Sequence, residues 1–596
     1  MSVRFLPQKL TLKALKFKST CAPKTAYNFW PIFIIGEVVL ETLIPTVMAV
    51  LIDEISKSIS MEPIIKYGLI LLAMALASLV CGFIAGKFAA TASCGYARNL
   101  RHDMYYKIQD FSFAEIDRFS TSSLVTRLTT DVTNVQNAYQ MIIRIAIRTP
   151  LMLIFAFVFS FRINWRIALI FLAAMPVLML ALALMMKFVM PFFRKIFRKY
   201  DDMNESVQEN VQAIRVVKSF VREDYEKGKF EKVSSEVRND FTKAERIMAL
   251  AWPIMMLCIF TVIAVIMFLG SKTIITSHGE KLTVGNLSAL INYAIMALMS
   301  MMMLSMVIVM LTMSIESANR IKEVLVTESS LKSPENGITT VENGDITFEN
   351  VSFKYSEKAE KYALENINLS IKSGETVGIL GGTGSSKSSL VQLIPRLYDV
   401  SEGRLLVGDK DVRDYDLVAL RDSVSMVLQK NVLFSGTIKE NIRWGNDAAS
   451  DEEIKRVCRL ACADEFIESF PDGYDTHIEQ GGTNVSGGQK QRLCIARALI
   501  KKPKILILDD STSAVDTKTD ALIRKAFKEE IPDTTKIIIA QRVASVEDAD
   551  KIIVMEGGRI AAIGTHEELM QTSEEYRSVY ESQTRHSDNE EGGDAQ

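Results

Sequence analysis

Residues 374–390 read GETVGILGGTGSSKSSL, an apolar strand that runs into a glycine-rich turn and then into a helix. The turn fits the pattern GxxxxGK[ST], whose backbone N–H groups and helix N-terminus cradle nucleotide phosphates. It departs from the pattern once, because Ser386 replaces the glycine before Lys387. A Cβ therefore stands where the backbone usually approaches a phosphate. The stretch predicts an α/β domain with a phosphate-binding loop.

Each position of this loop has an expected part in binding ATP and Mg²⁺. Lys387 is expected to reach the β- and γ-phosphates, and Ser388 to bind Mg²⁺. A second apolar strand, 505–508, ends in Asp509, where a carboxylate usually binds Mg²⁺ through water. The other predicted ATP-binding residues of the loop are Gly381, Gly382, Thr383, Gly384, Ser385, Ser386 and Ser389.

The two positions that would activate a water for hydrolysis are unusual. Asp510 follows Asp509, and Gln541 follows the strand 536–540. Asp is shorter than the usual Glu by roughly 1.5 Å, and a misplacement of about 1 Å can slow a reaction ~10²-fold. Gln donates a hydrogen bond but cannot carry positive charge or shuttle a proton, as His can. The pair predicts a degenerate catalytic centre; the alternative is slow catalysis by Asp510 with Gln541 positioning water.

The first half of the 596-residue chain predicts a membrane domain. Six apolar stretches reach the roughly 20 residues that span a bilayer, namely 28–52, 64–90, 139–161, 167–190, 248–270 and 286–312. The long segments 91–138 and 191–247 are charged and helical in pattern, so the helices are expected to continue about 35–40 Å into the cytoplasm. Basic residues in these two segments and at the N-terminus place the segments and the N-terminus in the cytoplasm. An even number of spans then places the nucleotide domain there too.

Charge and composition exclude some classes of protein and indicate the domain boundaries. The chain has 69 basic and 71 acidic side chains, a balance that argues against a dedicated nucleic-acid binder. Six spans exclude a soluble enzyme. Turn residues at 333–337 and the polar C-terminus predict a transmembrane domain at 1–325, a linker at 326–345, a nucleotide domain at 346–582 and a disordered tail at 583–596.

Residues 484–492 read NVSGGQKQR, which resembles the LSGGQ signature of ABC transporters. That family combines this signature with the two nucleotide motifs in the same order, and the whole chain resembles a half-transporter of the ABC exporter type. The implied fold is a six-span α-helical transmembrane domain with long cytoplasmic helical extensions, followed by an α/β P-loop ATP-binding cassette. Two such cassettes close head to tail around two ATP molecules.

The resemblance assigns further roles to residues of this chain. Tyr355 matches the aromatic that stacks on adenine, and Gln429 matches the Gln that binds Mg²⁺ and senses the γ-phosphate. Asp516 matches the loop that crosses between cassettes. Segments 114–119 and 213–218 resemble the two coupling helices. The signature residues Ser486, Gly487, Gly488 and Gln489 would act on the nucleotide of the partner cassette.

Intact signature residues beside a degenerate centre resemble one subunit of heterodimeric bacterial multidrug exporters. The implied partner is a homologous half-transporter with the catalytic Glu and the switch His. The implied activity is ATPase-coupled export of amphipathic small molecules across the inner (plasma) membrane, with very weak hydrolysis at the chain's own site. Open alternatives are a lipid or peptide exporter subunit and an ATP-gated channel or ATP sensor; the intact signature argues against the latter.

Ionisable side chains inside the predicted spans are costly unless they are paired. Glu37 and Glu41 lie one turn apart in the first span, and Arg144 and Arg148 one turn apart in the third. They are interpreted as structural ion pairs or as a cation-attracting site. Methionine, which adapts to varied ligands, is dense around the sixth span and suits either a drug path or simple packing: Met296, Met299, Met301, Met302, Met303, Met306, Met310 and Met313.

Overall fold

The computed structural model describes residues 24–57, 61–356, 359–510 and 515–591. The predicted cytoplasmic N-terminal segment 1–23 lies outside these residues. The chain forms two compact units. One contains residues 1–109 and 122–327, and the other contains residues 110–121 and 328–596. A short segment from the first half of the sequence therefore belongs to the second unit.

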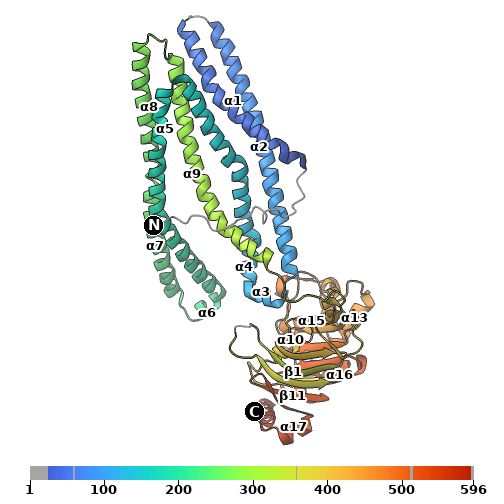
Figure 1. Cartoon of the computed structure of the whole chain (residues 1–596). Helices are drawn as coiled ribbons and strands as arrows, with labels where there is room; N and C mark the ends of the chain where they lie inside the picture. The colour runs from blue at the N-terminus through green and yellow to red at the C-terminus, as the bar shows by residue number, and fades with distance from the viewer. Residues whose placement is uncertain (1–23, 58–60, 357–358, 511–514, 592–596) are drawn as a thin grey trace. The chain divides into compact units, whose positions relative to one another are not determined.

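The first unit is a bundle of long helices. In Figure 1 the helices α1, α2, α5, α8 and α9 run lengthwise beside one another. Its elements are α1 (Lys24–Lys57), α2 (Met61–Gln109), α4 (Thr121–Thr126), a π-helical turn (Arg127–Asp131), α5 (Val132–Gln212), α6 (Ile214–Ser219), α7 (Glu223–Met248), α8 (Ala251–Thr276) and α9 (Val284–Val326). The two long segments predicted to be helical are helical over most of their length.

Five helices in the described part of the chain are long and apolar enough to cross a membrane. Six spans were predicted, and the expected third and fourth both lie in the 81-residue α5. The predicted loop 162–166 is reduced to one extended residue, Asn164, with φ −158° and ψ 108°. Its Oδ1 accepts hydrogen bonds from the N–H groups of Arg166 (3.1 Å) and Ile167 (3.2 Å). Asn164 thus interrupts the helix and caps its continuation.

An ion-pair cluster joins α1 to α5. The Arg148 Nη2 donates to both carboxylate oxygens of Glu41, at 2.7 and 2.6 Å. The Arg148 Nε lies 3.4 Å from the Glu37 Oε1, and Glu37 is only 7% exposed. One arginine therefore pairs with both glutamates of α1, which supports the interpretation of these residues as structural ion pairs.

The methionines of α9 do not share one surface. Met301 is buried, whereas Met303 and Met306 are about half exposed. Met296, Met299 and Met302 pack at the edge of the helical core. This distribution favours packing around the helix over a single methionine-lined path.

The second unit is built on a six-stranded sheet with the order β12-β11-β3-β10-β9-β6. Only β12 in this sheet is antiparallel to its neighbour. Its strands are β3 (Thr376–Leu380), β6 (Val424–Val427), β9 (Ile505–Asp509), β10 (Thr535–Ile539), β11 (Lys551–Glu556) and β12 (Arg559–Gly564). Every residue of β9 and β10 is buried, as expected for parallel strands covered on both faces.

A four-stranded antiparallel sheet, β2-β1-β4-β5, and a short ribbon, β7-β8, complete the strands. Their bounds are β1 (Ile346–Phe353), β2 (Leu364–Ile371), β4 (Glu402–Val407), β5 (Lys410–Asp411), β7 (Gly436–Thr437) and β8 (His477–Ile478). Because β3, β9 and β10 are parallel, the segments that follow them emerge at one edge of the larger sheet. These segments carry the phosphate-binding loop, Asp510 and Gln541.

The helices of the second unit include α3, which comes from the first half of the sequence. The helices are α3 (Phe113–Phe119), α10 (Lys387–Leu393), α11 (Leu417–Ser423), α12 (Ile438–Arg443), α13 (Asp451–Leu460), α14 (Asp464–Glu468), α15 (Gly487–Leu499), α16 (Thr517–Glu530), α17 (His566–Thr572) and α18 (Glu574–Glu591). Single 3-10 turns lie at Gly473–Asp475, Gln480–Gly482 and Val543–Ser545. Helix α18 continues through the predicted disordered tail as far as Glu591, and residues 592–596 lie outside the described residues.

Replacing Arg148 by Gln should lower the thermal stability of the detergent-solubilised protein. Glu37 and Glu41 would be left without their cation, at a cost of about 1–3 kcal/mol because the guanidinium is only partly buried. Thermal unfolding followed by tryptophan fluorescence measures the change. The double variant Glu41→Gln/Arg148→Gln, which removes the charges as a pair, should recover part of the loss. An unchanged melting temperature in Arg148→Gln would contradict the structural interpretation.

Candidate nucleotide-binding site

The loop between β3 and α10 has a backbone that requires glycine at its first position. Gly381 has φ +151°, and a Cβ there would collide with the carbonyl oxygen of Met555. Gly384 has φ +84°, in the left-handed region that glycine enters without steric cost. At Gly381 and Gly384 the loop therefore follows the tight backbone path that a phosphate-binding turn needs.

Ser386 departs from that path in its backbone as well as in its side chain. Its φ of +68° and ψ of 26° are left-handed, and its side chain makes no capping hydrogen bond to α10. An L-residue in this conformation costs about 1–2 kcal/mol, a cost that glycine avoids. The sequence predicted a steric fault at Ser386, and the structure adds backbone strain at the same residue.

Lys387, Ser388 and Asp509 lie close together at the carboxyl edge of the sheet. The Lys387 Nζ donates to the carbonyl oxygens of Gly381 (2.8 Å) and Gly382 (2.9 Å). Burial lowers the pKa of Lys387, and the charges of Asp509 and Asp510 oppose this shift. The Ser388 hydroxyl donates to the Asp509 Oδ1 at 3.1 Å.

The chemistry of this pair fits Mg²⁺. Hydroxyl and carboxylate oxygens are ligands that this ion accepts in nucleotide sites. Burial also raises the pKa of Asp509, which a hydrogen bond from Ser388 opposes. A buried carboxylate of this kind gains from a neighbouring cation, and Lys387 supplies only part of that charge.

Asp510 is held by two glutamine side chains. Its Oδ2 accepts from the Nε2 of Gln541 at 2.8 Å and from the Nε2 of Gln429 at 3.4 Å. Asp510 is 9% exposed and has φ +49°, a left-handed conformation that Asp adopts more easily than longer side chains. Three of the predicted site residues are thus in contact. The carboxylate lone pairs that a general base would use are partly occupied by amide donors.

The aromatic ring of Tyr355 is braced from one side. Its hydroxyl lies 2.7 Å from the Ser389 Oγ, and its ring is perpendicular to those of Phe353 and Tyr398, with centroids 4.8 and 5.2 Å away. Half of Tyr355 remains exposed. A braced, half-exposed ring beside the phosphate-binding loop suits the predicted stacking on adenine.

Tyr398 was not predicted from the sequence and connects Tyr355 to α3. Its hydroxyl donates to the Asp117 Oδ2 at 2.7 Å, and its ring lies 6.1 Å from that of Phe113. Burial and the hydrogen bond to Asp117 raise the pKa of Tyr398 well above its usual value, so the hydroxyl stays a donor at physiological pH. The segment resembling the first coupling helix is therefore bonded to the neighbour of the predicted adenine-binding ring.

Glu115 fastens α3 at its start. It accepts hydrogen bonds from the N–H groups of Ser112 (3.0 Å) and Ser330 (3.3 Å) and from the Ser112 hydroxyl. Burial would raise the pKa of Glu115, but these hydrogen bonds outweigh it and lower the pKa. Glu115 thus bonds the residue that precedes α3 and also the segment that leads into the cassette.

The predicted partner-facing residues occupy helix starts. Ser486 caps α15, and its side chain and that of Gln489 exchange hydrogen bonds with each other's backbone. Ser486 and Gly487 are exposed, which leaves a helix N-terminus available to an anion. Asp516 caps α16 through the Thr519 N–H, which lowers the pKa of Asp516. Residues 511–514, just before it, lie outside the described residues.

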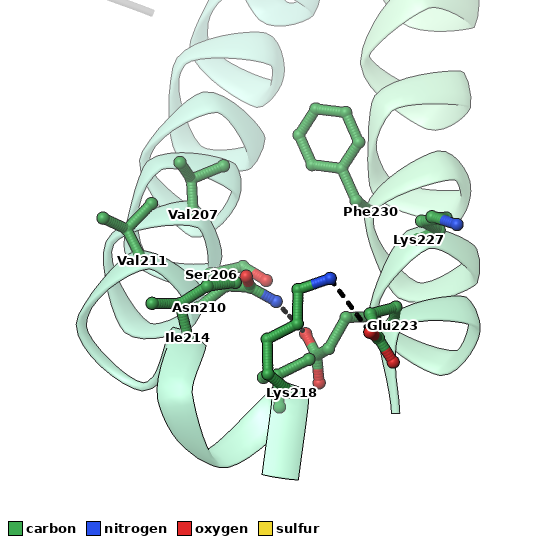
Figure 2. Close-up of a pocket in the computed structure, with 11 residues that line it drawn as sticks. Ser206, Val207, Asn210, Val211, Ile214, Lys218, Glu223, Lys227 and Phe230 are labelled. Atoms are coloured by element: carbon green, nitrogen blue, oxygen red, sulfur yellow. Dashed lines mark hydrogen bonds and ion pairs between the residues drawn. The ribbon is translucent and has the colours of Figure 1, made fainter. Parts of the chain in front are cut away.

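The segment resembling the second coupling helix encloses a pocket in the first unit. Figure 2 shows it between the end of α5, helix α6 and the start of α7, with a volume of about 310 Å³. The Asn210 Nδ2 donates to Glu226 and the Lys218 Nζ to Glu223, both at 3.0 Å. These bonds close the helical tip below the apolar side chain of Phe230. Docking of this tip on a cassette stays a prediction.

Residues 28–315 match the family described as ABC transporter transmembrane region, and residues 364–513 match the family described as ABC transporter. The Bacillus subtilis protein named uncharacterized ABC transporter ATP-binding protein YfiB is 37% identical over 93% of this chain and 95% of its own length. The chain belongs to the ABC transporter family. The recognition made from the signature and the phosphate-binding loop is confirmed at this level.

One further relative and one solved structure were compared with this ABC transporter. A Bacillus subtilis protein named putative multidrug export ATP-binding/permease protein is 36% identical over 62% of this chain and 63% of its own length. A solved bacterial Atm1-family ABC exporter with ATP bound has a TM-score of 0.80 and 22% identity, covering 94% of this chain and 99% of that one. The fold is that of an ABC exporter half-transporter, a multi-pass membrane protein with one ATPase domain.

Replacing Tyr398 by Phe should weaken the coupling of ATP use to transport. The ring packing stays, but the hydrogen bond to Asp117 is lost, and bonds to charged groups contribute about 1.5–3 kcal/mol. Transport per ATP hydrolysed, measured in proteoliposomes, should fall several-fold. Tyr362→Phe is the matched control, because Tyr362 donates to Glu402 at 2.6 Å on an exposed surface. Equal transport ratios in the two variants would contradict a coupling role.

Ser386→Gly should tighten binding of Mg-ATP. Removing about 1 kcal/mol of backbone strain corresponds to roughly a fivefold gain in affinity if the bound loop keeps this conformation. Photolabelling of this chain by an azido analogue of ATP, titrated against concentration, measures the change. Gly384→Ser, which places a side chain at φ +84°, should act in the opposite direction. Weaker binding by Ser386→Gly would show that the serine contributes a contact worth more than the strain.

Proposed function

We propose that this chain is one subunit of a heterodimeric ATP-driven exporter of amphipathic small molecules. It holds ATP at its own phosphate-binding loop with very weak hydrolysis and supplies its signature to the partner's competent site. The observation that carries this proposal is the Asp510 carboxylate, hydrogen-bonded to the amides of Gln541 and Gln429.

The binding half of the site is complete in residue type. Lys387 and the loop backbone would hold the phosphates, Ser388, Gln429 and Asp509 would hold Mg²⁺, and Tyr355 would stack on adenine. Bound Mg²⁺ would neutralise charge on the β- and γ-phosphates. The family of this cassette and the contact between Ser388 and Asp509 support these assignments.

Three features make the catalytic half deficient. Asp510 is shorter than Glu, its carboxylate already accepts two amide donors, and Gln541 cannot carry the charge or proton that a histidine carries. Each defect lowers the effectiveness of Asp510 as a base. Together they favour a site that retains ATP.

The intact signature is what favours a heterodimer. In a homodimer both sites would combine this deficient centre with a good signature, and neither would hydrolyse efficiently. A partner with the catalytic Glu and switch His would create one competent site, completed by Ser486–Gln489 of this chain. The proposed partner is therefore a homologous half-transporter with both residues.

The proposed setting is the inner (plasma) membrane, crossed six times, with the N-terminus and the cassette in the cytoplasm. The break at Asn164 supports two spans within α5, because 81 helical residues would extend about 120 Å, far beyond a hydrocarbon core of about 30 Å. The multidrug name of the Bacillus subtilis relative supports amphipathic small molecules as substrates.

Purified alone, the chain should show Mg-ATPase activity close to background, and co-purification with its partner should restore turnover. Introducing Asp510→Glu with Gln541→His into the chain alone should raise its ATPase rate at least tenfold, because it lengthens the base and supplies a titratable group. Asp510→Asn with Gln541→His is the matched control and should stay near background. Robust turnover by the unmodified chain alone would overturn the degenerate-site proposal.

A further inference from the structure

We infer that Gln583 on α18 is a positioning residue that fixes the segment after β10 and thereby the contact between Gln541 and Asp510. The Gln583 Nε2 donates to the carbonyl oxygen of Gln541 at 2.8 Å. The N–H of Val543 donates to the Gln583 Oε1, also at 2.8 Å. One carboxamide therefore binds the backbone on both sides of Arg542.

This two-point clamp acts on the residue that holds Asp510. The backbone of Gln541 is fixed by Gln583, and the side chain of Gln541 donates to the Asp510 Oδ2 at 2.8 Å. The Asp510 N–H in turn donates to the Ile539 carbonyl at 3.0 Å, at the end of the same strand. A continuous set of hydrogen bonds thus leads from α18 to the deficient catalytic centre.

Helix α18 is anchored firmly enough to serve as a fixed point. Tyr576 is 1% exposed, and its hydroxyl lies 2.7 Å from the His566 Nδ1 on α17. The Tyr580 ring packs against the same histidine, with centroids 5.2 Å apart. Gln583 follows Tyr576 by two helical turns, so the two side chains lie on the same face of α18.

The chemistry of the clamp requires a carboxamide. It needs one donor for the Gln541 carbonyl and one acceptor for the Val543 N–H, and glutamine offers both on a single group. A glutamate at 583 would keep the acceptor but would place an oxygen against the Gln541 carbonyl. An alanine would remove both bonds. Gln583 therefore contributes to keeping nucleotide in place, without contacting it.

This inference rests on the proposed function, because it assumes that the site retains nucleotide. The experiment measures release of a photoreactive azido-ATP from the full chain in its assembled complex. Complex loaded with the analogue and Mg²⁺ is chased with excess ATP, cross-linked at intervals, and the label on this chain is separated from that on its partner. Melting temperature is recorded for each variant as a check on folding.

Gln583→Ala should release the analogue threefold to tenfold faster than the unmodified chain, with little change in melting temperature. Gln583→Glu should release it at least as fast, since the donor is lost and a negatively charged oxygen would face the Gln541 carbonyl oxygen. Ser582→Ala, on the same helix, should release the analogue at the unmodified rate, because among the described residues the Ser582 hydroxyl bonds within the helix to Val579. Release from Gln583→Ala at the unmodified rate would overturn the clamp.

Two further comparisons separate the possible failures. If Gln583 acts through the Gln541 side chain, then Gln583→Ala should raise the release rate less than twofold when it is introduced into the Gln541→Ala variant. Fully additive effects of the two changes on the release rate would overturn the proposed route. If the unmodified chain itself releases nucleotide within seconds, retention and hence the proposed function fail. The clamp then still predicts at least a threefold change in the ATP concentration for half-maximal turnover with kcat preserved, and an unchanged value overturns it.

Discussion

The hydrogen bond between Gln541 and Asp510 is the interaction on which the proposed function of this cassette depends. It joins the ends of two neighbouring parallel strands, β10 and β9, at the edge where the phosphate-binding loop also emerges. A carboxylate that already accepts hydrogen bonds from uncharged amides is poorly equipped to activate water. We propose that this arrangement favours retention of ATP at this site, with hydrolysis at a partner's site.

Much of the cassette could be predicted because its motifs are local. The phosphate-binding loop, the end of β9 and the signature each lie within about a dozen residues, and each imposes its own backbone geometry. Parallel pairing of buried strands then brings Ser388, Asp509 and Asp510 to one edge of the sheet. The strain at Ser386 was only half predicted, since a sequence shows the added Cβ but not the left-handed backbone that it must adopt.

The residues that sequence reasoning missed are those whose contacts span the chain. Tyr398 meets Asp117 across 281 positions, and Gln583 meets Gln541 across 42, with no periodicity or motif to mark either pair. The predicted loop at 162–166 was wrong in form for a different reason. A single Asn164 both breaks the helix and caps its continuation, so a five-residue loop is not needed.

The most direct test of the account identifies the nucleotide held by this chain during turnover. The assembled transporter would be incubated with Mg²⁺ and azido-ATP labelled on either the α- or the γ-phosphate, then cross-linked and separated into its two subunits. Retention of intact ATP predicts that this chain carries both labels in equal amount, whereas its partner carries mainly the α-label. Loss of the γ-label from this chain at the same rate as from its partner would contradict the central claim.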